Sequence, residues 1–155
     1  SLQGMMTMRE REGANIQADL LRRADTMSDI IESIAERRPL IIQQYEERLQ
    51  KKMTAILEKL QAQPEQDRLL QEVAVYADKV DFTEEVVRFR SHVLQLRGLL
   101  EAHGDTGRKL DFLIQEMNRE TNTIGSKAQD LQVTEQVLRL KNEIEKIREQ
   151  VQNIE

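Results

Sequence analysis

Apolar side chains recur every three or four residues along almost the whole chain, and this spacing is the period of an α-helix. Strand-like alternation of apolar and polar residues is absent. The clearest helical stripe is the last, where seven apolar positions alternate by four and three residues, as in the seam of a coiled coil: Val133, Val137, Leu140, Ile144, Ile147, Val151 and Ile154. The sequence therefore predicts an all-α fold class with a C-terminal helix of the coiled-coil type.

The two prolines set the expected ends of the first helices. Arg38 precedes Pro39, and a residue before proline is pushed out of the helical conformation, so we expect one helix to stop near Glu36 and another to begin at Pro39. These two would form a long helical hairpin over residues 1–63, which ends at the break of Pro64. Residues 64–155 would add a helical bundle, giving about six amphipathic helices in total.

Three further stripes predict buried residues within 64–155. Asp81, followed three residues later by Glu84, resembles a capping box and predicts a helix start. The stripes are Leu70, Val73, Ala77 and Val80 in a short helix; Phe82, Val86, Phe89, Val93, Leu96 and Leu100 in the next; and Leu110, Ile114, Met117, Thr121 and Ile124 after that.

Composition excludes several classes of protein. With 23 basic and 28 acidic residues the net charge is −5, so the chain as a whole is not a strongly basic nucleic-acid binder. The absence of Cys excludes disulfides and thiolate zinc sites. No apolar run is long enough for a membrane span, so we expect a soluble, cytoplasmic protein with no membrane partner. Two Tyr and three Phe predict no aromatic platform for stacking bases.

The charge is unevenly distributed. Residues 1–63 are neutral overall, whereas residues 107–127 carry four basic and three acidic side chains inside an acidic second half. On a helical projection a polar wedge lies opposite the apolar stripe of this segment, formed by Arg108, Phe112, Gln115, Arg119 and Asn122, with Glu116, Thr123 and Lys127 beside it. The basic residues suit phosphate, and the carboxylates of Asp111, Glu116 and Glu120 suit a hard cation.

A second polar set lies at i, i+3 and i+7 in the preceding helix, and consists of Glu85, Arg88 and His92. Two interpretations stay open for this set. It is either part of a functional site or a solvated ladder of ion pairs, each of which would stabilise the helix by only a few tenths of a kcal/mol.

Several blocks of the sequence resemble the bacterial YicC/YloC family. The most specific is GRKLDFLIQEMNRETNTIGSK at 107–127. Others are ADKVDFTEE at 77–85 with Arg88 and His92, IREQVQNIE at 147–155, and REREG at 9–13. The resemblance implies a divalent-metal-dependent endoribonuclease, formerly called a stress-induced protein, that uses Mg²⁺ or Mn²⁺ and no small-molecule cofactor. It also implies RNA as substrate, a ring-shaped, hexamer-like homo-oligomer, and an N-terminal α+β domain without a counterpart here. We therefore expect this chain to be the helical part of a longer protein.

Carried over residue by residue, the family's polar signature falls on both polar sets. The resemblance implies catalytic roles for His92, Glu116 and Glu120, with Glu116, Glu120 and Asp111 as candidate metal ligands and His92 as a general acid or base. Phosphate contacts would come from Arg88, Arg108, Lys109, Arg119 and Lys127, supported by Glu85, Gln115 and Asn122.

The alternative is a non-catalytic helical module for oligomerisation and RNA clamping, in which the same polar residues build subunit interfaces or grip phosphates. A plain coiled-coil adaptor is less favoured, because the 107–127 segment carries more than a packing stripe. Exposure separates the first two: an open cleft at His92, Glu116 and Glu120 favours the enzyme, and a sealed cluster favours the module.

Overall fold

The computed structural model describes residues 2–102 and 107–154, with side chains over 11–102 and 107–153. This part of the chain forms five helices: α1 (Leu2–Glu58), α2 (Gln66–Lys79), α3 (Thr83–Glu101), α4 (Gly107–Ala128) and α5 (Leu131–Ile154). No strand occurs among these residues. The predicted all-α fold class is confirmed.

The hairpin predicted over residues 1–63 is wrong, because α1 runs through Pro39 without a break. Proline costs a helix interior about 3 kcal/mol, since it has no N–H for the carbonyl four residues earlier and its ring crowds that turn. Packing on both sides outweighs this cost. Ile34 and Ile41, two turns apart and flanking the proline, are both buried in one core, while Pro39 lies on the exposed side of α1.

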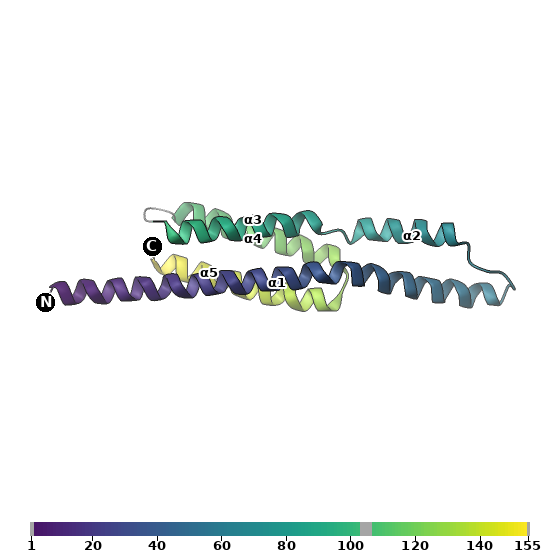
Figure 1. The fold of residues 1–155 in the computed structure, drawn as a ribbon, viewed down its shortest axis with the longest axis horizontal. Coiled ribbons are helices and arrows are strands. Elements are labelled where there is room, and N and C mark those ends of the chain that lie inside the picture. The colour runs from purple at the N-terminus through teal and green to yellow at the C-terminus, as the bar shows by residue number, and fades with distance from the viewer. Residues whose placement is uncertain (1, 103–106, 155) are drawn as a thin grey trace.

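Four of the helices form an antiparallel bundle in which α1 packs against α3, α3 against α4, α4 against α5, and α5 back against α1 (Figure 1). The buried stripes of all four helices meet in a single hydrophobic core, to which α1 contributes residues from Leu20 to Ile41. The division into domains at residue 63 stays a prediction. The helix α2 packs against the later part of α1, in line with α3 and beyond the bundle (Figure 1).

The predicted stripes of α3, α4 and α5 are confirmed. All their members whose side chains are described are buried, apart from the half-buried Leu100. The stripe predicted for α2 is confirmed at Val73 and Val80 and wrong at its other two positions. Leu69 is buried in place of Leu70, and Tyr76 in place of Ala77. The ring of Tyr76 stacks on that of Tyr45 in α1, with centroids 3.7 Å apart, so contact with α1 decides which face of α2 is buried.

Charged side chains fix the helix junctions. Asp130 caps α5 by accepting a hydrogen bond from the Val133 N–H at 3.2 Å, and it also accepts two hydrogen bonds from the Arg37 guanidinium of α1. The hydrogen bonds from Arg37 hold the pKa of the Asp130 carboxyl below its usual value. The predicted capping box is wrong, because the N-cap of α3 is Phe82 and Glu84 pairs with Arg88. Asp81 lies one residue before the cap, where it accepts a hydrogen bond from the Thr83 N–H at 3.0 Å.

None of the described helices is long and apolar enough to cross a membrane.

Candidate metal centre

The antiparallel contact of α3 with α4 brings three predicted site residues together. His92 of α3 faces Glu116 and Glu120 of α4, which are four residues apart and therefore lie one above the other on the same helix face. One ligand atom from each side chain can be chosen so that all three lie within 4.8 Å of one another. His92 Nε2 is 3.7 Å from Glu120 Oε1, longer than a hydrogen bond.

The trio of His92, Glu116 and Glu120 contains buried polar groups that lack close partners. Glu120 is 4% exposed, and its one ion-pair partner among the described residues is His92. His92 Nδ1 is buried and has no hydrogen-bond partner within that same part of the chain. A buried carboxylate is normally paired or bound to a metal, and the contact of Glu120 with His92 is too long for a hydrogen bond. Glu116 is only half-buried, and the trio is therefore open to solvent on its side.

The donors present suit a divalent cation. Two carboxylates supply the hard oxygen ligands that Mg²⁺ and Mn²⁺ prefer, and an imidazole nitrogen is a ligand more typical of transition metals. Three protein ligands in a partly open position leave room for water or substrate. The residues therefore fit a bound cation, with Mn²⁺ favoured over Mg²⁺ by the histidine.

Asp111, the third metal ligand predicted from the sequence, is not part of this trio. It precedes Glu116 by five residues, so it projects from a different side of α4. The carboxylate of Asp111 interacts instead with Arg148 of α5. The pKa of Arg148 is raised chiefly by a hydrogen bond to Glu145, and the charge of Asp111 adds a small further increase. We therefore remove Asp111 from the candidate metal ligands.

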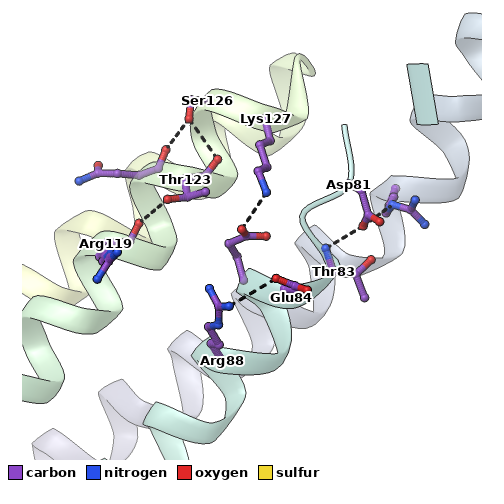
Figure 2. Close-up of polar contacts among 11 residues, drawn as sticks. Asp81, Thr83, Glu84, Arg88, Arg119, Thr123, Ser126 and Lys127 are labelled. Atoms are coloured by element: carbon purple, nitrogen blue, oxygen red, sulfur yellow. Dashed lines mark hydrogen bonds and ion pairs between the residues drawn. The ribbon is translucent and has the colours of Figure 1, made fainter. Parts of the chain in front are cut away.

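Glu85 and Lys127 close the other end of the seam between the two helices. Lys127 extends from α4 toward the start of α3 (Figure 2), where its Nζ donates a hydrogen bond to Glu85 Oε1 at 2.9 Å. This bond raises the pKa of Lys127, and Glu85 itself is 4% exposed. The solvated ladder considered for Glu85, Arg88 and His92 is wrong, because Glu85 and His92 face α4 and only Arg88 lies in solvent.

The remaining predicted residues lie on the surface. Arg88 pairs with Glu84 on its own helix at 3.3 Å (Figure 2). Lys109 of α4 is exposed. The wedge predicted on α4 is confirmed as an exposed face of this helix, formed by Arg108, Phe112, Gln115, Arg119 and Asn122. These side chains are free to meet a ligand, but they do not join the trio.

Sequence reasoning missed Gln95. This residue follows His92 by three positions and so shares its face of α3. It lines a hollow of about 480 Å³ together with Arg108, Lys109 and Phe112 of α4. The i, i+3 spacing from His92 was the available signal.

Comparison with known proteins supports the resemblance seen in the sequence. The model of the family described as endoribonuclease YicC-like, C-terminal, matches residues 34–155. A probable endoribonuclease YicC of Clostridioides difficile (strain 630) is 47% identical over 148 residues, which are 96% of this chain and 50% of that protein. Another of that name, from Haemophilus influenzae, is 34% identical over 154 residues, or 99% of this chain and 52% of that protein.

This chain therefore spans about half the length of the curated relatives that it matches. The family match covers the last part of α1 and all of α2 to α5. It therefore includes His92, Glu116 and Glu120. The chain belongs to the YicC-like family, and it corresponds to the C-terminal region of that family.

Proposed function

We propose that this chain is the C-terminal helical part of a cytoplasmic endoribonuclease that depends on a divalent cation, which His92, Glu116 and Glu120 hold. The observation that carries the proposal is the convergence of these three side chains from two helices, with a buried carboxylate that lacks a close cation partner. The names of the two relatives support RNA hydrolysis as the activity of the full-length protein.

The cation would supply Lewis-acid stabilisation of the phosphate charge and a water of lowered pKa as nucleophile. The protein's own residues fix where this happens. Glu120 and His92 anchor the buried side of the site, and Glu116 leaves its outer side open to a phosphodiester.

His92 is assigned to cation binding rather than to proton transfer. Its Nδ1 is buried and its Nε2 faces Glu120, so the imidazole is directed into the seam between α3 and α4. A general acid or base needs to reach the proton that it transfers, directly or through one water.

Phosphate binding is assigned to the basic side chains on the exposed face of the same helix. Arg108, Lys109 and Arg119 are exposed on α4, before and after Glu116. Guanidinium groups bind phosphate oxygens with two parallel hydrogen bonds. Lys127 has a smaller role in this proposal, because its ammonium is already bonded to Glu85.

We also propose that the full-length protein forms a ring-shaped, hexamer-like homo-oligomer, as the sequence resemblance implies. Exposed apolar side chains on α2, at the end of α1 and in the turn after it support contact with another copy: Ile56, Leu60, Leu70 and Val75. Light scattering after size-exclusion chromatography tests this, and a monomer at micromolar concentration contradicts it.

The experiment that tests the activity is cleavage of a labelled RNA by the full-length protein, with Mn²⁺ or Mg²⁺ and with EDTA. We expect cleavage to need the cation, and Glu116→Gln or Glu120→Gln to lower the rate by at least about a hundredfold, since loss of residues that merely orient ligands already costs about 10–100-fold. Glu135→Gln, at an exposed position of α5, is the matched control and should cleave like the wild type.

The non-catalytic clamping module remains the second candidate, favoured by the burial of Glu85 and Glu120. Unchanged cleavage by Glu120→Gln, together with intact RNA binding, would contradict the metal centre and favour the module.

A further inference from the structure

A hollow lies one helical turn from the candidate metal centre, between the end of α3 and the start of α4. Its volume of about 480 Å³ is within the range of about 300–1,000 Å³ that is usual for sites of small ligands. Leu99 and Leu113 give it an apolar lining, and Leu113 is itself buried. The hollow is thus a shaped, partly apolar surface and not only a row of charges.

Phe112 provides an aromatic ring in this lining. The sequence predicts no aromatic platform for stacking bases. Phe82 and Phe89 are buried in the core, as this prediction requires, but Phe112 is 59% exposed. An exposed ring of this size does not contribute fully to the stability of the bundle. A ring beside a nucleic-acid groove offers a stacking surface that accepts any base, because every base has a π-face.

Polar groups of two kinds complete the hollow. Arg108 and Lys109 are both exposed and carry the positive charge that phosphates need. Gln95 donates its amide N–H to Ser91 Oγ at 3.2 Å, so its amide oxygen can accept a hydrogen bond from a base edge. Aromatic stacking, positive charge and an amide acceptor together fit a nucleotide better than a purely apolar ligand.

The position relative to the metal centre follows from helix geometry. Phe112 precedes Glu116 by four residues on α4, and Gln95 follows His92 by three residues on α3. These offsets correspond to about 6 Å and about 4.5 Å along the helix axes. A base in the hollow would therefore place an adjoining phosphodiester beside Glu116, on the open side of the trio.

We propose that this hollow is a subsite for one RNA base, which stacks on Phe112 while Arg108 and Lys109 contact the flanking phosphates. The choice of RNA as ligand rests on the proposed function, and the subsite adds to it a defined position for the strand next to the cation ligands. The role of Phe112 in the subsite is binding, not chemistry.

The test measures RNA binding by the full-length protein in EDTA, by fluorescence anisotropy, so that it does not depend on cleavage. Two probes of equal length and charge are compared: a single-stranded RNA and the same strand with abasic sites. Phe112→Ala should weaken RNA binding by about 5- to 150-fold, as loss of one stacked base predicts, and should bind both probes equally. Phe112→Trp should restore the preference of the wild type for the strand with bases.

A second variant tests the hollow without removing the ring. A Cβ added at Gly98 would meet no protein atom within 4 Å, so Gly98→Leu can fill the hollow from α3 and leave the fold intact. We expect it to lose the preference for bases as Phe112→Ala does. Leu94→Ala removes an exposed apolar residue of α3 outside the hollow and is the matched control.

The outcomes separate the two proposals. If the wild type binds RNA but Phe112→Ala and Gly98→Leu keep the preference for bases, the subsite is overturned and the proposed function stands. Equal loss on both probes would overturn stacking as the role of Phe112. If Glu120→Gln still cleaves RNA while the preference depends on Phe112, the subsite stands and the metal assignment fails. A wild type that binds no RNA overturns both.

Discussion

Glu85 and Glu120 are two equally buried glutamates, each 4% exposed, at two positions along the contact between α3 and α4. Glu85 accepts a hydrogen bond from the Lys127 ammonium at 2.9 Å. Glu120 has a histidine at 3.7 Å and a second glutamate close by. The same helix pair therefore holds one buried carboxylate that is hydrogen-bonded to a cationic side chain and another whose nearest ion-pair partner is a histidine beyond hydrogen-bond distance.

The difference indicates distinct roles for the two positions. At Glu85, one carboxylate oxygen is held by the Lys127 ammonium, and the other, Oε2, is buried with no hydrogen-bond partner among the described residues. An unbalanced carboxylate destabilises the fold unless something binds to it, and such costs are concentrated at functional sites. Four predictions test this distinction, from the largest effect to the smallest.

We expect a cation to act on the molecule through Glu120 and not through Glu85. We expect Mn²⁺ at about 100 times its dissociation constant to raise the free energy of unfolding of the wild type by about 2.7 kcal/mol. Glu120→Gln should lose this response, yet without cation it should be at least as stable as the wild type, because an unpaired buried charge is gone. Urea unfolding with and without Mn²⁺ measures both, and an equal response of variant and wild type contradicts the metal centre.

Removing the balancing charge should turn Glu85 into a second unpaired carboxylate. Lys127→Met is expected to lower the free energy of unfolding by about 1–3 kcal/mol, toward the lower end because the lysine side chain is 40% exposed. Adding Glu85→Gln should recover part of the loss. The response to Mn²⁺ should survive in Lys127→Met, and its disappearance would show that the two ends of the seam are not independent.

The carboxylate of Asp130 should make the stability of the fold depend on pH. The Asp130 carboxyl, whose pKa is lowered by Arg37, contributes stability at pH above its unfolded value of about 3.9, and this is lost as the pH falls through the lower folded value. Asp130→Asn should cost about 1.5 kcal/mol at neutral pH and progressively less below about pH 4. Urea unfolding over a pH series tests this, and a constant difference would mean that the charge of Asp130 is not what matters.

The exposed ion pair of Arg88 with Glu84 should have the smallest effect on the free energy of unfolding. Both side chains are more than half exposed, so Glu84→Ala and Arg88→Ala should each change the free energy of unfolding by no more than about 0.5 kcal/mol. A double-mutant cycle by thermal unfolding measures the coupling. A coupling as large as that of Glu85 with Lys127 would remove burial as the explanation of the difference.

Much of the fold could be predicted because its helices bury narrow stripes. The stripes of α3, α4 and α5 required only the helical period, and residues such as Phe89 and Leu140 are fully buried as expected. The predicted helix break at Pro39 was wrong because the sequence shows the local cost of a proline but not the packing of Ile34 and Ile41 that compensates for it.

The candidate site was predictable in membership but not in arrangement. Glu116 and Glu120 share a helix face by spacing alone, and spacing also placed His92 in a polar set of the preceding helix. The family resemblance added the expectation that all three act at one site. The register between α3 and α4 decides that His92 meets Glu120, that Glu85 meets Lys127 and that Asp111 is left out. Register depends on contacts between helices, which no single-helix pattern contains.

The placement of the trio on consecutive helices also bears on the order in which the molecule is built. His92 and Glu120 are 28 positions apart, whereas the ion pair of Arg23 with Glu143 joins residues separated by 120. The entropy lost on closing a loop grows with its length, and local contacts form sooner than distant ones. We therefore expect the cation ligands to meet within the α3–α4 hairpin before α1 and α5 pack against each other.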